Sequence, residues 1–172
     1  MNTPTHILIS MAALGEPNDR TRNTMAFAGA LLPDAAIFVL WGGAKIMGTG
    51  ERTIWGELYK NPFWQEVIAI GNSVPIYLSL LGLSCLVLKY RPHLKTRAMM
   101  AALFSLSALL HIAFDFPFHA GDAHRHFWPL SDWRFYSSVS YWDDDHHGSV
   151  VRILELAIAV FLSVILWKRF KN

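Results

Sequence analysis

Long apolar blocks separate short polar stretches along this chain, and the apolar residues neither alternate nor fall into one helical stripe. Four blocks have the length of a membrane-spanning helix: residues 24–46, 67–88, 98–118 and 150–167. Crossing the hydrocarbon layer takes roughly 20 mostly apolar residues, in a helix that satisfies its own backbone hydrogen bonds. The pattern therefore predicts four transmembrane helices.

A fifth apolar stretch, residues 7–14, is about half as long as a spanning helix. The start of the sequence lacks the basic region that precedes a cleaved signal peptide, so we expect this stretch to remain as a short N-terminal half-helix. The expected fold is an all-α integral membrane helical bundle. It forms one domain, residues 1–172, with a loop at residues 119–148 that is rich in histidine, aspartate and aromatic residues.

Composition agrees with a membrane protein, because 53% of the residues are hydrophobic and 16% are charged. The single cysteine, Cys85, cannot form an intrachain disulfide or a thiolate metal cluster, and we expect it to pack in the core. Membrane lipid is the expected environment, and another membrane protein is a candidate partner. We expect no nucleic-acid partner.

The placement of charges predicts how the helices are oriented. The connection KYRPHLKTR, residues 89–97, and the end WKRFKN, residues 167–172, are basic and contain no acid, which is typical of cytoplasmic segments. Residues 120–148 then lie on the opposite side, and they hold five aspartates. The C-terminus is therefore expected in the cytoplasm.

Residues 48–66 fall on the same outer side by alternation. Their tryptophan and tyrosine side chains suit the interface between membrane and water. We expect one or two short surface helices here, interrupted at Pro62, because proline lacks a backbone donor and has a fixed φ.

An ionisable pair lies near the outer end of the third long block. His111 and Asp115 are four residues apart, so they share one face of a helix, and Pro117 follows as a kink or a helix end. A charge in the hydrocarbon costs about 3 kcal/mol on insertion scales, so such side chains face protein or water. An isolated pair of this kind would only hydrogen-bond helices together.

Three more histidines follow closely: His119, His124 and His126. Imidazole and carboxylate groups are ligands that zinc and related divalent ions take. The density of nitrogen ligands exceeds what joining helices requires, so we interpret the region as a divalent metal site with zinc as the expected ion. Taken singly, His124 and His126 fit equally well as solvated loop residues.

Two further polar residues lie in apolar surroundings. Asp34 follows Pro33 inside the first long block, where the proline interrupts the helical hydrogen bonds and opens room for a polar contact. It fits a functional carboxylate and a hydrogen bond to a neighbouring helix equally well. His6 lies at the start of the short apolar stretch, and its interest depends on whether it meets Asp34 and His111 in space.

The segment YWDDDHHGS, residues 141–149, precedes the last long block. The helix dipole explains acids at this position without a metal. Two adjacent histidines point in different directions, so at most one of His146 and His147 joins a common site. Glu155, within the last block, is expected to pair with Arg152 or His147.

Three motifs, taken in order, resemble a known family. They are THILIS near the start, GALLPD in the first long block, and HIAFDFPFHAGDAHRHFWPLSDWRF at residues 111–135. Together they resemble the bacterial inner-membrane metal-dependent hydrolases over most of the chain. The resemblance implies a multi-pass protein of the bacterial inner (cytoplasmic) membrane. It carries the family's motif residues onto His6, Asp34, His111 and Asp115, then Trp128, Pro129, Trp133, Arg134 and Phe135.

One motif of that family is missing. A central His-Arg-Gly-x-Thr-His-Ser stretch does not occur, and the corresponding region reads VIAIGNSVPIYLS, residues 67–79. Asn72 and Ser73 stand where the His-Ser pair would be, and asparagine is a poor zinc ligand beside histidine. Three outcomes stay open: a reduced site, a replacement ligand from His119, His124 or His126, or a scaffold without catalysis.

The first function that fits is a membrane-bound metal-dependent hydrolase with its site near the extracytoplasmic side. The expected ligands are His6, Asp34, His111 and Asp115, with His119, His124 and His126 as further donors. The ion would acidify a water and polarise a phosphoryl or acyl oxygen. We assign the catalytic roles to Asp115 and Asp34, because a carboxylate left free by the ion can act as a general base. Nearby aromatic residues favour a lipid-linked substrate with a phosphoester or ester bond.

The alternative is a non-catalytic helical membrane subunit or assembly factor. Its polar cluster would bind a metal or haem, or would only join helices. The missing central motif favours this alternative, whereas the surplus of histidines favours the hydrolase.

Overall fold

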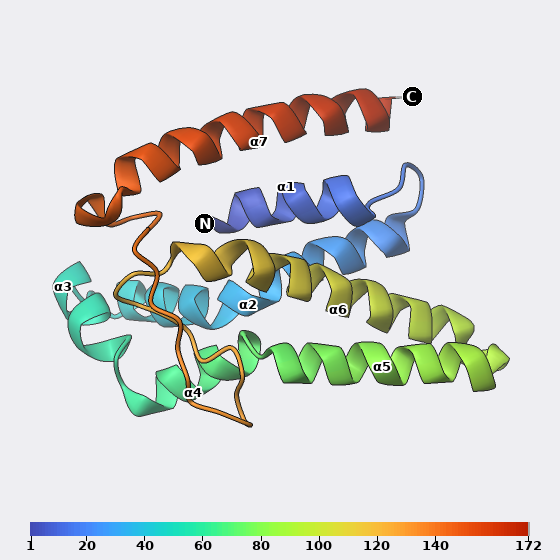
Figure 1. The fold of residues 1–172 in the computed structure, drawn as a ribbon, viewed down its shortest axis with the longest axis horizontal. Coiled ribbons are helices and arrows are strands. Elements are labelled where there is room, and N and C mark those ends of the chain that lie inside the picture. Colours follow the sequence, from blue (N-terminus) through green and yellow to red (C-terminus); the bar gives the residue numbers. More distant parts are fainter. Residues whose placement is uncertain (172) are drawn as a thin grey trace.

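Four long apolar segments form the body of the chain in this computed structural model, which describes residues 1–171 (Figure 1). Those long and apolar enough to cross a membrane are Arg20–Ile46, Pro62–Tyr90, Pro92–Phe118 and Gly148–Lys171. The short helix α1, Thr3–Leu14, precedes them, and the described residues contain no strand. The predicted all-α bundle of four spanning segments and a short N-terminal helix is confirmed.

The long segments are built from four main helices: α2 (Arg20–Ile46), α5 (Val74–Tyr90), α6 (Lys95–Asp115) and α7 (Gly148–Lys171). Shorter elements connect them: α3 (Glu51–Thr53), η1 (Ile54–Leu58), α4 (Pro62–Gly71), η2 (Pro92–Leu94), η3 (Phe116–Phe118) and η4 (Asp144–His146). Helix α6 lies between α2 and α5 and packs against both, and α1 packs against α2, α6 and α7. The sequence at 119–148 crosses one end of the bundle (Figure 1).

Helices α2 and α6 approach each other closely through small residues. A Cβ added at Gly29 would lie 2.3 Å from the Phe104 carbonyl oxygen and 2.7 Å from Ser107 Cβ. The Ser107 hydroxyl also donates to the Ala26 carbonyl of α2 at 2.5 Å. Without a hydrophobic effect between helices in lipid, close backbone approach and such hydrogen bonds hold spanning helices together.

The second apolar block contains a break that its hydropathy does not reveal. Helix α4 ends at Gly71 and α5 begins at Val74, so the expected continuous helix over residues 67–88 is two helices. Ser73 is the N-cap of α5, where its hydroxyl accepts from the Ile76 amide at 3.2 Å, and Pro75 follows in the first helical turn. A capping serine followed by proline starts a new helix even inside an apolar run.

The surface segment before α4 matches the expectation of short helices interrupted at Pro62. One helical turn, α3, runs directly into η1, and Pro62 then starts α4 after the N-cap Asn61. Proline suits the first position of a helix because the missing donor would have had no helical partner there.

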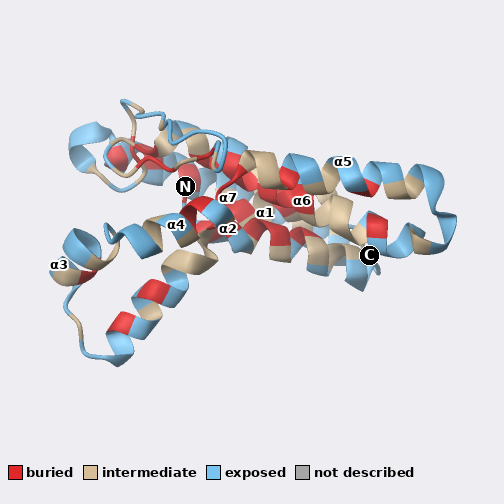
Figure 2. Ribbon diagram, turned by 90° about the horizontal axis from the view of Figure 1, so that it is seen from below, coloured by how far each residue is buried: buried red, intermediate tan, exposed pale blue. Residues whose placement is uncertain are grey.

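Buried residues gather in the middle of the bundle (Figure 2), and many large apolar side chains are exposed on the long helices. On α7, Ile153, Leu156 and Phe161 are each more than 60% exposed. This surface suits lipid contact. Cys85 is exposed as well, so the expectation that it packs in the core is wrong; it lies on the outer surface of α5.

The two ends of the bundle differ in chemistry. The start of α1, the end of α6 and the 119–148 loop lie at one end, and the basic connection between α5 and α6 lies at the other (Figure 1). The C-terminal part of α7 joins the basic end, where Arg169 donates to the Ala12 carbonyl at 3.0 Å and to the Gly15 carbonyl at 2.7 Å. The histidine cluster and the basic connection between α5 and α6 thus lie at opposite ends of the bundle.

Candidate metal centre

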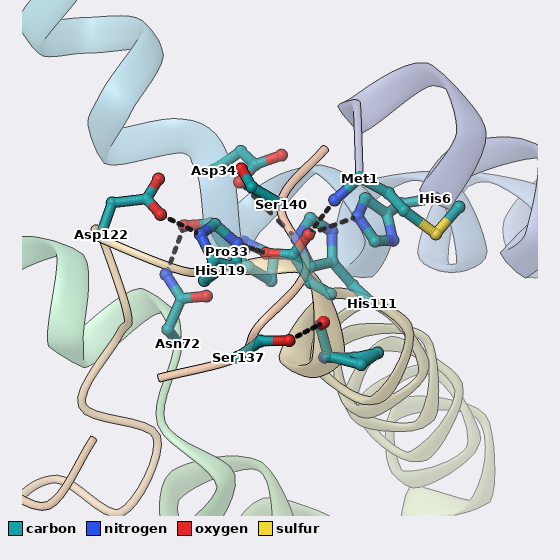
Figure 3. A network of polar contacts seen from close by, with 12 residues as sticks. Met1, His6, Pro33, Asp34, Asn72, His111, His119, Asp122, Ser137 and Ser140 are labelled. Atoms are coloured by element: carbon teal, nitrogen blue, oxygen red, sulfur yellow. Dashed lines mark hydrogen bonds and ion pairs between the residues drawn. The ribbon is translucent and has the colours of Figure 1, made fainter. Parts of the chain in front are cut away.

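Side chains from distant parts of the sequence meet where α1 begins and α6 ends (Figure 3). The rings of His6 and His111 stack with centroids 3.8 Å apart. His6 Nε2 lies 3.3 Å from Asp115 Oδ1, which the backbone nitrogen of Met1 also contacts. These three side chains, His6, His111 and Asp115, are at most 3% exposed. The sequence placed all three in the site, and the structure brings them together.

The protonation of His111 is fixed by its surroundings. Its Nδ1 lies 2.6 Å from the Ala30 carbonyl oxygen of α2, which can only accept a hydrogen bond, so Nδ1 carries the proton. The other nitrogen, Nε2, is buried and has no hydrogen-bond partner among the described residues. Metal-binding histidines usually donate their second ring nitrogen to a carbonyl or carboxylate in this way.

Asp34 reaches the same cluster from α2. Its Oδ1 lies 3.6 Å from His111 Nε2, and its Oδ2 accepts from the Thr3 hydroxyl at the start of α1. The Asp34 side chain is 16% exposed, whereas those of His6 and His111 are fully buried. Asp34 is therefore the accessible carboxylate next to this histidine pair.

The 119–148 loop covers the cluster, and its histidines are buried. His119, His124 and His126 are each 4% exposed, which removes the interpretation of His124 and His126 as solvated loop residues. The loop is fixed at the break between α4 and α5, where the Val74 amide donates to the His126 carbonyl at 2.9 Å and the Ser73 hydroxyl donates to the Trp128 carbonyl.

Asn72 has a structural role at this break. Its side-chain amide donates to the Pro33 carbonyl of α2 at 3.0 Å. Its backbone carbonyl oxygen lies 3.2 Å from His126 Nδ1. The carbonyl can only accept, so His126 also carries its proton on Nδ1. Asn72 therefore orients His126 and holds α4 against α2.

Asp115 joins the loop histidines to the pair from α1 and α6. Its Oδ2 lies 2.5 Å from His119 Nε2, and His119 Nδ1 lies 3.0 Å from Asp122 Oδ1. The ring of His124 meets that of His119 edge-on with centroids 4.6 Å apart. The two oxygens of Asp115 thus face two different groups of histidines.

Burial and neighbouring charges shift the titration of the loop residues. Burial opposes the charge on His119, but the adjacent Asp115 outweighs it and raises the pKa of His119 to about 9. Burial and the neighbouring His119 lower the pKa of His124 to about 3. Burial also lowers the pKa of His126. At neutral pH His124 and His126 are therefore uncharged and each keeps a lone pair for a ligand.

Two sets of side chains have the spacing to hold a metal ion. The first is His6, His111 and Asp115, and the second is Asp115, His119 and His124; within each set, one ligand atom per residue lies within 4.8 Å of the others. Ligand atoms about 2.0 Å from a tetrahedral zinc ion lie about 3.3 Å from one another, so the farthest ligand atoms would approach by at most about 1.5 Å. His119 Nε2 and Asp115 Oδ2, which are 2.5 Å apart, would separate slightly. The unpartnered Nε2 of His111 and Nδ1 of His6 fit the donor set that a divalent ion requires.

Several residues take positions that the sequence reasoning did not assign. Asp122 contacts the cluster through His119, and its spacing of three residues from that histidine was an available signal. His146 is exposed and paired with Asp143, and His147 is exposed, so neither belongs to the cluster.

Glu155 has a partner other than the expected Arg152 or His147. Its carboxylate accepts from the Asn2 backbone amide at 2.6 Å and from the Asn2 side chain at 2.9 Å, while Arg152 pairs with Asp144 instead. The contact with Asn2 joins two ends of the chain, which spacing along the sequence cannot reveal. Glu155 thereby fixes the start of the helix that carries His6.

A surface hollow of about 530 Å³ lies away from the cluster, at the far end of α1, where Met11, Asn23 and Phe27 line it. At the cluster itself, the side chains of Asp34 and Asp122 are 16% and 21% exposed. These two carboxylates mark where the cluster reaches the surface.

Comparison of the chain with known proteins found no matching protein-family profile, no matching curated protein and no matching solved structure.

Proposed function

We propose that this chain is a membrane-embedded metal-dependent hydrolase, of the kind that its LLPD and HxxxD motifs resemble. The observation that carries the proposal is the convergence of His6 with His111 and Asp115, buried groups from two segments more than 100 residues apart. Buried ionisable groups are costly in a membrane protein unless they are paired or bind an ion, and they commonly mark function.

His6, His111 and Asp115 would hold the ion, with Asp34 beside them, and zinc fits the mixed nitrogen and oxygen donors. A bound divalent ion supplies Lewis-acid chemistry that acidifies water and polarises the oxygen of a phosphoester or ester. The Ala30 carbonyl accepts the proton on His111 Nδ1 and so leaves the Nε2 lone pair, next to Asp34, for the ion. Asp34, the accessible carboxylate, is placed to accept a proton from an incoming nucleophile.

The surroundings of the cluster favour a lipid-linked substrate. Large apolar side chains of the 119–148 loop are exposed around the site, among them Leu130 at 79%, Tyr136 at 60%, and Trp133 and Trp142 at 52% each. Aromatic side chains at this depth sit at the interface of membrane and water, where the polar part of a lipid lies. The orientation that follows from the basic ends puts this surface on the extracytoplasmic side of a bacterial inner membrane, with the C-terminus in the cytoplasm.

A non-catalytic scaffold is the competing function, and one observation favours it. The short contact of 2.5 Å between His119 Nε2 and Asp115 Oδ2 pairs two buried groups of opposite charge directly. If such pairs only join helices, the chain folds and binds its partners without a metal, and no metal-dependent turnover exists.

The direct test measures metal content and turnover together. The purified chain in mild detergent is expected to hold zinc in at least equimolar amount and to hydrolyse a chromogenic phosphodiester or ester. His111→Ala and Asp115→Ala each remove ligands and are expected to reduce both metal content and turnover. His93→Ala is the matched control, because His93 is exposed at the far end of the bundle. Substoichiometric metal that neither variant changes would contradict the proposal.

A further inference from the structure

The carboxylate of Asp115 lies between two histidine groups, with one oxygen toward each. Its Oδ1 faces His6 Nε2 at 3.3 Å, and its Oδ2 faces His119 Nε2 at 2.5 Å. Because Asp115 belongs to both sets with metal-binding spacing, we propose that the cluster binds two divalent ions bridged by the Asp115 carboxylate. This rests on the proposed function for the first ion and adds a second site, made of Asp115, His119 and His124.

His119 has the surroundings of a metal ligand. Its Nδ1 lies 3.0 Å from Asp122 Oδ1, on the side of the ring opposite Asp115. A carboxylate at this distance can accept the Nδ1 proton after a small rotation, because neither atom has another hydrogen-bond partner among the described residues. Nε2 would then be free to bind an ion next to Asp115 Oδ2. This series of carboxylate, histidine and metal is the common way in which an outer partner orients a ligating imidazole.

His124 completes the second set. It is 4% exposed, its ring lies edge-on to that of His119, and one of its ring nitrogens lies within 4.8 Å of ligand atoms of Asp115 and His119. An ion between His119, His124 and Asp115 would take this nitrogen as a ligand.

The donors of the cluster also suit two ions. Asp34, Asp115 and Asp122 bring three carboxylates to one region, where the Met1 ammonium contacts Asp115, and the histidine ligands of an ion are neutral. Two ions held about 3.5–4 Å apart are a known arrangement for hydrolysing phosphoesters, because they stabilise the attacking and the leaving oxygen together.

The two sites share one residue and differ in the others, so variants can separate them. His124→Ala removes a ligand of the second ion only, and His111→Ala removes a ligand of the first only. His146→Ala is the matched control from the same loop, since His146 is exposed and bound to Asp143. His124→Gln keeps a polar side chain of similar size and tests whether loss of metal follows from loss of folding.

The experiment loads the full-length chain in detergent with Mn²⁺ and measures the bound ions per chain and the electron paramagnetic resonance spectrum. The wild type and His146→Ala are expected to bind two ions and to give the signal of a coupled pair. His124→Ala and His124→Gln are expected to bind one ion and to give the six-line signal of isolated Mn²⁺.

One bound ion in the wild type, with a six-line signal that His124→Ala leaves unchanged, would overturn the second site and leave the proposed function standing. Loss of both ions in a folded His124→Gln chain would also overturn it, because all ligands would then serve one centre. A wild-type chain that binds no ion contradicts the proposed function as well.

Discussion

Asp115 contacts more of the cluster than any other residue described here. It faces His6 with one oxygen and His119 with the other. Removing one partner of a buried charged pair typically lowers the unfolding free energy by about 3–5 kcal/mol, because the remaining charge stays buried without compensation. Its replacement therefore affects both folding and metal binding.

Asp115→Asn keeps the shape of the side chain and removes its charge. We expect the metal-free chain to lose about 3 kcal/mol of unfolding free energy and the loaded chain to lose its bound metal. Unfolding in mixed detergent micelles and elemental analysis measure the two effects. Asp132→Asn is the control, because the Asp132 side chain is 82% exposed; equal effects of the two changes would contradict this role.

Asp122 acts on the ion through His119 and does not need to touch it. We expect Asp122→Asn to weaken metal affinity by about 10–100-fold, the usual cost of losing an outer partner of a ligating histidine. The number of ions bound at saturation should stay the same. A metal titration monitors both quantities, and Asp145→Asn, in the exposed part of the same loop, should leave both unchanged. If Asp122→Asn bound fewer ions at saturation with unchanged affinity, this role of Asp122 would be contradicted.

At the scale of elements, the crossing of α2 and α6 aligns Asp34 with His111. Gly29 is required there, because an added Cβ would lie 2.3 Å from the Phe104 carbonyl oxygen. The same contact brings His111 within 2.6 Å of the Ala30 carbonyl. Packing of small residues in the membrane therefore determines the geometry of the site.

Gly29→Ala is expected to destabilise the chain by about 1–3 kcal/mol, the usual cost of overpacking. Gly42→Ala on the same helix is the matched control. An added Cβ there meets no atom within 4 Å, and alanine favours a helix by about 1 kcal/mol over glycine. Detergent titration measures the unfolding free energy of both variants, and the two values are compared. A stability of Gly29→Ala equal to that of Gly42→Ala would contradict the close crossing.

Glu155 connects α7 to the start of α1 through Asn2. We expect Glu155→Ala to loosen the first turn of α1 and to lower metal affinity, although Glu155 is not a ligand. Glu57→Ala, in the surface turn η1, serves as the control. Metal titration distinguishes the two, and an unchanged affinity in Glu155→Ala would remove this positioning role.

At the scale of the whole molecule, the basic ends lead us to expect the C-terminus in the cytoplasm. A green fluorescent protein joined after Lys171 should therefore fluoresce, and alkaline phosphatase joined at the same point should be inactive. The opposite pair of results would reverse the orientation and put the histidine cluster on the cytoplasmic side.

Much of this architecture follows from the sequence, because membrane burial imposes long apolar helices that hydropathy detects directly. His111 and Asp115 were predictable as neighbours from helical spacing alone. The break at Asn72 was not, because Ser73 and Pro75 lie inside an apolar run whose hydropathy hides a helix start. The role of Glu155 could not be predicted either, because its partner Asn2 lies 153 residues away in the sequence.

The candidate site shows the same division. The sequence supplied its residue types, and it left open whether His119, His124 or His126 takes the place of the missing central motif. The fold brings His119 and His124 to Asp115, while Asn72 holds His126 by its backbone carbonyl. These contacts depend on how the 119–148 loop docks on α4 and α5, which local spacing does not encode.

The most direct test of the metal centre is X-ray absorption at the zinc edge on the zinc-loaded, full-length chain. We expect the zinc to have only nitrogen and oxygen neighbours, at about 2.0–2.2 Å, together with the outer-shell scattering of imidazole rings. Asp115→Asn should lose this zinc signal. Sulfur scattering at about 2.3 Å, or zinc that is lost on gel filtration of the wild type, would contradict it.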